Sequence, residues 1–181
     1  MHMTDDAEFG ARDTRRKTMK IRTAEEKDMP ELLAIYNYEV EHGVATFDLN
    51  SKTMEERLIW FKEHNVDNHP LIVAEEDQKA VGYASLSPYR DKEAYQATVE
   101  LSLYVAYDYR RRGIAGELAA FILRAARERD DIHTVISVIT GGNEASIRLH
   151  ERLGFVHCGT IREVGVKFGK LLDIENYQIM V

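Results

Sequence analysis

Residues 98–127, with the sequence TVELSLYVAYDYRRRGIAGELAAFILRAAR, decide the fold of this chain. Their first part, residues 98–106, is rich in β-branched, aromatic and aliphatic side chains, which is typical of a buried strand. The second half places Leu118, Ile122 and Ala125 at helical spacing, which predicts an amphipathic helix. The stretch therefore predicts a strand that leads into a helix through one short turn.

The turn between this strand and this helix is basic and contains small residues. A helix N-terminus offers free backbone N–H groups and the positive end of the helix dipole, and guanidinium groups lie beside it here, so the turn suits a diphosphate. It lacks the Gly-Lys-Ser/Thr of a P-loop and the GxGxxG of a dinucleotide site. A solvated connection is the alternative interpretation of the same arginines. The turn consists of Arg110, Arg111, Arg112, Gly113, Ile114, Ala115 and Gly116.

The other elements are predicted from local patterns. Thr53 and Glu56 form a capping box that starts a helix. Asn143 can cap a later helix, and Gly154 suits the left-handed residue that ends it. The order of elements is strand, two helices, three strands, helix, strand, helix and two strands. This order gives one mixed α/β domain over residues 19–181.

The composition is that of an ordinary globular protein and limits its partners. A hydrophobic share of 44% and a charged share of 30% over 181 residues suit one domain with its own core. The formal net charge of −7 argues against nucleic-acid binding, which needs a basic surface. No apolar stretch approaches the roughly 20 residues of a membrane span. Residues 1–18 are charged and poor in apolar side chains, so we expect a flexible leader there, outside the fold.

Cys158 is the only cysteine of the chain. A single cysteine excludes an internal disulfide and suits a reducing compartment, so we expect a cytoplasmic protein. Its apolar neighbours in the sequence predict a small core residue rather than a nucleophile. The seven histidines show no metal-ligand spacing, and no metal is predicted.

The pattern Arg-x-x-Gly-x-Ala at residues 110–115 resembles the coenzyme A signature of the GNAT acyltransferase superfamily. Residues 143–155, NEASIRLHERLGF, are similar to its second conserved block, and residues 103–105 resemble its central strand. The resemblance covers residues 19–181. It implies a single-domain α/β GNAT fold, with a mixed, mostly antiparallel sheet of about seven strands flanked by about four helices.

Acetyl-CoA is the co-substrate that this resemblance implies. The diphosphate would lie on the basic turn, the central strand would meet the thioester and the pantetheine arm through its backbone, and the second block would contact the arm from the other side. Besides the turn, the residues so assigned are Leu103, Tyr104, Val105, Asn143 and Ser146.

Within the superfamily, the chain resembles the phosphinothricin and methionine sulfoximine N-acetyltransferases. His150 points to this branch, because most of the superfamily has Tyr there. The narrower match also includes residues 45–47, 94–100 and 165–169, whereas residues 171–172 are Leu-Leu where the branch often carries Trp and His. The resemblance implies a small amino-acid-like amine as acceptor. It also implies a homodimer, because relatives are often dimers.

Two residues are predicted to take part in the chemistry. Amino-acid amines are mostly protonated at neutral pH, so acetyl transfer needs a base. Glu100 stands in an otherwise apolar strand, where partial burial raises the pKa of a carboxyl, and we expect it to take the amine proton through water. An edge-facing or salt-bridged carboxylate is the alternative. The resemblance makes His150 a general acid for the departing thiol or the group that fixes its sulfur, with a helix-surface histidine beside Glu151 as the alternative.

The acceptor side is predicted from the resemblance and from side-chain chemistry. Phe47 and Tyr95 are expected as walls of a small pocket. Glu93 and Ala94 would supply backbone contacts, and Arg90 a cation for a carboxylate or phosphinate. Two other functions stay open: the same fold acting on a protein N-terminus or a polyamine, and a non-catalytic acyl-CoA-binding regulator. A closed pocket with a cation favours an amino acid, and an open acidic groove favours a polypeptide amine.

Overall fold

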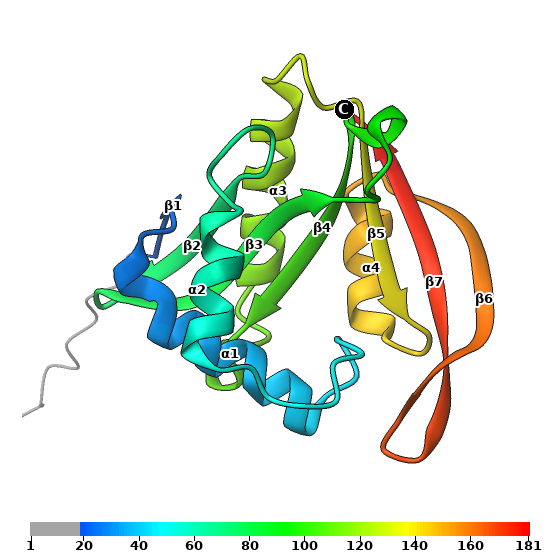
Figure 1. Cartoon of the computed structure of the whole chain (residues 1–181), viewed down its shortest axis with the longest axis horizontal. Coiled ribbons are helices and arrows are strands. Elements are labelled where there is room, and N and C mark those ends of the chain that lie inside the picture. Colours follow the sequence, from blue (N-terminus) through cyan, green and yellow to red (C-terminus); the bar gives the residue numbers. More distant parts are fainter. Residues whose placement is uncertain (1–18) are drawn as a thin grey trace, which may run out of the picture.

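A computed structural model of the chain describes residues 19–181. These residues form one seven-stranded sheet in the order β1-β2-β3-β4-β5-β7-β6 (Figure 1). Within it β4 and β5 are the parallel pair, and the other neighbours run antiparallel. The leader predicted for residues 1–18 lies outside the described residues. The strands are β1 (Lys20–Thr23), β2 (Leu71–Glu76), β3 (Lys79–Pro88), β4 (Thr98–Val105), β5 (Thr134–Thr140), β6 (Val156–Lys167) and β7 (Lys170–Met180).

Four α-helices cover the sheet, α1 and α2 on one face and α3 and α4 on the other (Figure 1). The predicted fold is confirmed: residues 19–181 form a mixed, mostly antiparallel sheet of seven strands with four α-helices, in the order expected from the sequence. Three short 3₁₀ helices stand in the connections. The helices are α1 (Met29–His42), α2 (Met54–Lys62), α3 (Ile114–Arg127), α4 (Glu144–Arg152), η1 (Glu26–Asp28), η2 (Glu93–Tyr95) and η3 (Tyr107–Tyr109).

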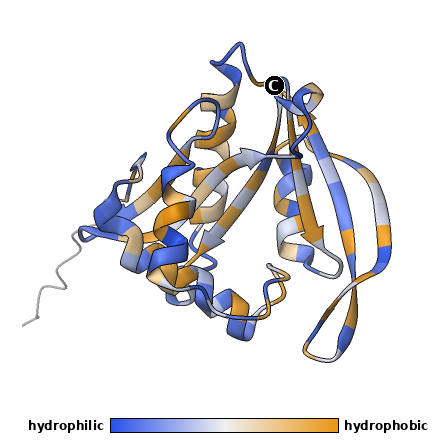
Figure 2. Ribbon diagram, viewed as in Figure 1, coloured by the Kyte–Doolittle hydropathy of each residue, from blue (hydrophilic) through white to orange (hydrophobic). Residues whose placement is uncertain are grey.

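The sheet has an apolar core on each face because the side chains of a strand alternate between its two faces. In β2, Ile72 and Ala74 belong to the cluster under α3, whereas Leu71 and Val73 belong to the cluster under α1 and α2. Figure 2 shows the apolar residues gathered along the strands and on the helix sides that meet them. The helix predicted after the basic turn supplies Leu118, which is fully buried.

The predicted helix caps are confirmed. The Thr53 hydroxyl accepts from the backbone N–H of Glu56 at 3.2 Å, and the Glu56 carboxylate accepts from the N–H of Thr53 at 2.7 Å. Asn143 accepts from the N–H of Ser146 through its side chain at 3.3 Å. Gly154, after α4, has φ +93°, which is the left-handed conformation that favours glycine. The helix boundaries are therefore set by local chemistry.

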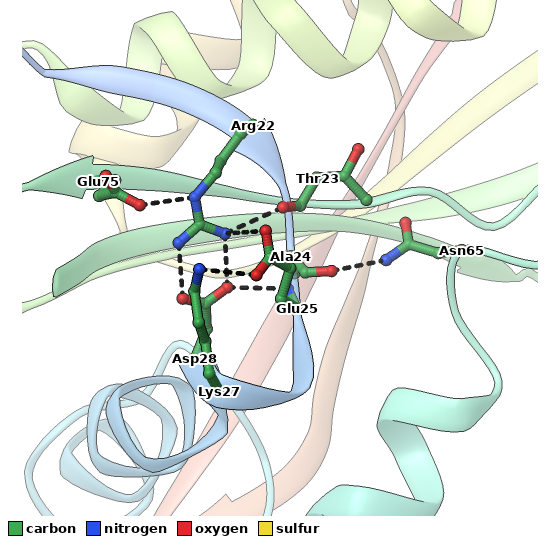
Figure 3. Close-up of polar contacts among 8 residues, drawn as sticks. All are labelled: Arg22, Thr23, Ala24, Glu25, Lys27, Asp28, Asn65 and Glu75. Carbon is green, nitrogen blue, oxygen red and sulfur yellow. Dashed lines mark hydrogen bonds and ion pairs between the residues drawn. The ribbon is translucent and has the colours of Figure 1, made fainter. Parts of the chain in front are cut away.

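Strand β1 is only four residues long and is fastened by one half-buried arginine (Figure 3). Arg22 donates to both carboxylate oxygens of Asp28, at 2.7 and 2.8 Å, and to Glu75 of β2 at 2.6 Å. Burial alone would raise the pKa of Asp28, but the hydrogen bonds from Arg22 and from a backbone N–H outweigh it, and the pKa is lowered. Asn65 donates to the carbonyl of Ala24 at 3.3 Å. These contacts fix the first strand and η1 against the sheet.

Cys158 is exposed, so the prediction of a core residue is wrong. It stands in β6, an edge strand of the sheet, where the pairing with β7 is irregular between His157 and Gly159. An edge strand has a neighbour on one side only, and apolar residues near Cys158 in the sequence are exposed with it, Val156 to 64%. Within residues 19–181 no helix is long and apolar enough to cross a membrane.

Candidate active site

A gap opens in the middle of the sheet because β4 and β5 separate (Figure 1). The two strands pair only from Thr98 to Glu100 on β4, after which β5 continues along β7. The N–H of Ala106 donates to Val81 of β3 at 2.9 Å. The backbone N–H and C=O groups of successive residues point to opposite sides of a strand. Those of Leu103 and Val105 therefore point away from β3 and into the gap.

The gap widens into a cavity of about 880 Å³. It is lined by β4, β5, the N-terminal end of α3, one side of α4, the last turns of α1 and the loop that follows α1. Most of the predicted site residues come together here, although Phe47 and His150 are about a hundred residues apart in the sequence. Those that line the cavity are Phe47, Glu100, Leu103, Tyr104, Val105, Arg110, Arg111, Gly113, Ile114, Ala115, Gly116, Asn143, Ser146 and His150.

The cavity has two ends, which we call the α3 end and the hairpin end. The α3 end consists of residues 110–116 together with the α4 residues that face them. The hairpin end consists of residues 45–47 together with Val164 of β6 and Ile174 of β7. Glu100 also lines the cavity and stands at the last paired position of β4, where β4 and β5 begin to part.

The α3 end has the geometry expected of an anion site. Gly113 is the N-cap residue and has φ +87°, and the N–H of Glu117 is bonded to its carbonyl. The N–H groups of residues 114–116 therefore precede the first bonds of the helix and face its N-terminal end. A Cβ atom at Gly113 would meet nothing within 4 Å, so the space above this backbone is open. The donors and the open space fit a diphosphate such as that of coenzyme A.

The three arginines of the turn have different surroundings. Arg110 donates to the carboxylate of Glu39 on α1 and, at 3.2 Å, to the carbonyl of Val105. Arg112 lies outside the cavity lining and donates to the buried Glu76 at 2.7 Å. Arg111 forms no side-chain hydrogen bond or ion pair within the described chain, and it lines the cavity. Of the three guanidinium groups, that of Arg111 is the one open to an incoming anion.

His150 is buried at 2% exposure and is held at both ring nitrogens, so it is not a helix-surface residue. Its Nδ1 lies 2.8 Å from the carbonyl of Ser146, which can only accept, so Nδ1 carries the hydrogen. Its Nε2 then accepts from the hydroxyl of Ser137 on β5 at 2.9 Å. Burial lowers the pKa of His150, which keeps the ring neutral at neutral pH.

Glu100 is half-buried in the cavity wall, and burial raises the pKa of its carboxyl above the ordinary value. Within residues 19–181 no hydrogen bond or ion pair reaches this carboxylate. The salt-bridged alternative therefore does not describe its surroundings. A carboxylate in such a place can accept a proton from a bound ligand.

Residues 89–95 lie apart from this cavity. The guanidinium of Arg90 stacks over the rings of Tyr89 and Tyr95, at 5.0 and 5.7 Å, and these side chains line a separate hollow of about 500 Å³. Glu93 and Ala94 belong to η2 and are exposed. The structure thus brings Phe47 to the main cavity but not the other residues predicted for the acceptor, whose role stays a prediction.

Several cavity residues were not predicted from the sequence. Ser137 stands in a strand whose apolar and polar residues alternate, and it is buried. A polar residue at an inward-facing position of such a strand could have indicated a site residue. The others come from elements whose relative placement only the fold gives. They include Tyr36, Glu39, Ser102, Thr140, Leu149, Arg152, Val164 and Ile174.

No group of three His, Cys, Asp or Glu side chains within the described part of the chain is arranged to hold a metal ion.

Residues 31–155, more than half of the chain, match the model of the acetyltransferase (GNAT) family. The chain belongs to the GNAT acetyltransferase family. This GNAT protein is 42% identical over 163 residues to the phosphinothricin N-acetyltransferase of Streptomyces coelicolor, covering 88% of this chain and 95% of that protein. It is 36% identical over 160 residues to the L-methionine sulfoximine/L-methionine sulfone acetyltransferase of Pseudomonas aeruginosa, covering 88% of this chain and 92% of that one.

Solved structures of this family superpose well on the chain. A ribosomal-protein-alanine N-acetyltransferase from Brucella melitensis matches with a TM-score of 0.86 at 43% identity, covering 90% of this chain and 99% of that one. A phosphinothricin acetyltransferase from Sinorhizobium meliloti, solved in complex with acetyl-CoA, matches with a TM-score of 0.87 at 30% identity, covering 91% of this chain and 89% of that one. The chain is therefore a GNAT N-acetyltransferase similar to the phosphinothricin and methionine sulfoximine enzymes, as its sequence motifs indicated.

Proposed function

We propose that this protein transfers the acetyl group of acetyl-CoA to the primary amine of a small amino-acid-like acceptor of the phosphinothricin or methionine sulfoximine type. One observation carries the proposal: Glu100, half-buried and without a partner in the described chain, lies in one cavity with the open N-terminal end of α3. Similarity to the phosphinothricin enzyme of Streptomyces coelicolor supports the choice of acceptor.

Glu100 is the base of the proposed reaction. The acceptor arrives as an ammonium ion, and Glu100 takes one of its protons, directly or through one water. The freed nitrogen forms a bond to the acetyl carbon, and the bond from that carbon to sulfur breaks. The nitrogen loses a second proton, which ends on the departing thiolate. The raised pKa of Glu100 brings its proton affinity closer to that of the amine, which favours the first transfer.

The backbone of β4 polarises the carbonyl in this proposal. Leu103 and Val105 direct their backbone groups into the gap, so their N–H groups can donate to the oxygen on which negative charge develops. Arg111 and the N–H groups of residues 114–116 would hold the diphosphate at the α3 end, with Asn143 and Ser146 along the arm.

His150 is assigned the second of its two predicted roles. Because Nδ1 donates to the Ser146 carbonyl and Nε2 accepts from Ser137, the neutral ring has no second proton to give. It instead fixes the hydroxyl of Ser137, which lines the cavity, by accepting its hydrogen, and so sets the shape of the wall against which the thioester would lie. His150 is therefore a positioning residue for the thioester.

A protein N-terminus is the second candidate acceptor. The specific support is the similarity, at 43% identity, to a structure named as a ribosomal-protein-alanine N-acetyltransferase. The two candidates are separated by thiol release from acetyl-CoA, measured with phosphinothricin, L-methionine sulfone, a polyamine and an alanine-initiated peptide. We expect turnover with the two small acceptors. Turnover with the peptide alone would show that the acceptor is a protein N-terminus and not a small amino acid. Turnover with none of the amines would contradict the proposal.

We also propose that the protein is a cytoplasmic homodimer. Strand β6 is the edge of the sheet, and the β6–β7 hairpin carries exposed apolar side chains suited to a second copy. An exposed free thiol at Cys158 suits a reducing compartment. Light scattering after size exclusion measures the mass in solution, and a monomer at micromolar concentration would contradict the dimer. The exposed apolar residues of this hairpin are Val156, Ile161, Val164, Val166, Phe168, Leu171 and Met180.

A further inference from the structure

We infer that Lys167 and Gly165 of β6 position the loop of residues 43–48 and thereby determine which acceptor fits. The inference rests on the proposed function, because it gives residues 45–47 the acceptor side of the cavity. These two residues lie in the final hairpin, about 120 residues after the loop they contact. Neither lines the cavity, so both would act through the loop.

Lys167 fastens the loop by its ammonium group. Its side chain is buried, with the residue only 3% exposed, and Nζ donates to the carbonyl of Thr46 at 2.8 Å and to the carbonyl of Glu39 at 3.2 Å. Glu39 lies in the last turn of α1, where its carbonyl also accepts from the N–H of Gly43 and the negative end of the helix dipole favours a cation. A buried ammonium needs such partners to offset its desolvation. One lysine thus ties the end of α1 and the loop to the end of β6.

Gly165 makes room for the aromatic ring of the same loop. A Cβ atom at Gly165 would lie 2.4 Å from Cε2 and 2.5 Å from Cδ2 of Phe47, well inside contact distance. Gly165 does not have the positive φ that requires glycine, so space is the reason for glycine at this position. The ring of Phe47 therefore packs directly on the backbone of β6.

Other contacts fasten the loop on its remaining sides. Thr140 of β5 donates to the carbonyl of Val44. The hydroxyl of Tyr36 is 3.0 Å from that of Thr46 and donates to Asp48 at 2.7 Å. With α1 and β5 supporting one side, the two β6 contacts decide how far residues 45–47 stand from the hairpin. Val164, which precedes Gly165, lines the cavity beside them.

The consequence concerns one end of the cavity only. The N–H groups of residues 114–116 belong to α3, and neither Lys167 nor Gly165 contacts that helix. Lys167 reaches the α3 end only through Glu39, whose main-chain carbonyl it bonds and whose carboxylate holds Arg110, and this link includes neither Arg111 nor the N–H donors. Loss of the β6 contacts should therefore weaken the use of the acceptor and leave the affinity for acetyl-CoA nearly unchanged.

The first test compares Lys167→Met with Lys170→Met. Lys170 pairs with Lys167 across the hairpin but is exposed, so its replacement removes the same charge without touching the loop. We expect Lys167→Met to raise the KM for phosphinothricin by about tenfold or more, the factor carried by one charge-assisted hydrogen bond. The calorimetric Kd for acetyl-CoA should stay within about twofold, and Lys170→Met should match the wild type. An unchanged acceptor KM in Lys167→Met would overturn the inference, and so would an equally large rise in the Kd for acetyl-CoA.

The second test uses Gly165→Ala with Phe47→Leu, and it serves if Lys167→Met fails to fold. Gly165→Ala must displace the ring and should raise the acceptor KM. In the Phe47→Leu background Gly165→Ala should raise the acceptor KM much less, because the smaller leucine side chain can move aside. Additive effects of the two substitutions would show that they act independently and would contradict the inference.

A third measurement does not depend on any acceptor. Hydrogen exchange of residues 43–48 should be faster in Lys167→Met than in wild type by about tenfold, and unchanged in Lys170→Met. If the wild-type protein acetylates no small amine, the proposed function fails while this readout still tests the loop. Unchanged exchange in Lys167→Met would remove the positioning role whatever the substrate is.

Discussion

The two ends of the cavity are built in different ways. The α3 end comes from one continuous stretch, residues 110–116, in which a strand turns directly into a helix. The hairpin end is assembled from residues 45–47, Val164 and Ile174, which are far apart in the sequence. The first uses backbone N–H groups, which do not depend on side-chain identity, whereas the second uses side chains held by contacts from α1, β5 and β6. A substitution at the hairpin end can therefore change its shape without touching the N–H donors of residues 114–116.

The largest effect is expected at Glu100, which belongs to neither end and lines the cavity where β4 and β5 part. Glu100→Gln keeps the shape of the side chain but removes the base, and it should lower kcat by about 10²–10⁴-fold. The Kd for acetyl-CoA and the KM for the acceptor should change little, since neither end is altered. The exposed Glu128 provides a control, and Glu128→Gln should behave as the wild type. A wild-type kcat for Glu100→Gln, measured by thiol release, would remove this residue from the mechanism.

The pH dependence of kcat refines this prediction. Glu100 must be ionised to accept a proton, and burial raises its pKa above the ordinary 4.5. The rate should therefore fall as the pH drops through this raised pKa, at a higher pH than an exposed carboxyl would give. In Glu100→Gln this fall in rate at low pH should disappear, while any pH dependence that belongs to the acceptor amine should remain. An identical fall in rate at low pH in both proteins would show that another group causes it.

A smaller effect separates two neighbouring arginines of the α3 end. Arg111→Ala removes the cation that is open to a phosphate and should weaken acetyl-CoA binding by about tenfold, with the Tm unchanged. Arg112→Ala removes the cation bound to the buried Glu76 and should lower the Tm by a few degrees with little effect on acetyl-CoA. Calorimetry and thermal unfolding of both variants check the pair. The reverse pattern would show that the two side chains have exchanged roles.

The sequence was most informative where chemistry is local. The turn at Gly113, the capping box of Thr53 and Glu56, and the cap at Asn143 involve residues within a few positions of one another, so their types alone define the geometry. Residue types could not show that Arg110 would meet Glu39, because 71 positions separate them. Such partners depend on how the elements pack.

The residues expected on the acceptor side are brought together only in part, for the same reason. Phe47 lines the cavity, but the contacts that hold it come from β6, and a glycine in a strand gives no sign of the ring that needs its space. Arg90 and Tyr95 stand in a separate cluster, which their spacing in the sequence could not reveal. Cys158 was misplaced because an apolar neighbourhood in the sequence does not distinguish an edge strand from a buried one.

The account depends most on the α3 end, and calorimetric titration of acetyl-CoA into the wild-type protein and Gly113→Val tests it directly. Valine at φ +87° is strained, and its side chain would fill the open space above the helix N-terminus. We predict that the wild type binds acetyl-CoA and that Gly113→Val binds it at least about tenfold more weakly with its fold retained. Equal affinity in the two proteins, or no binding by the wild type, would contradict the account.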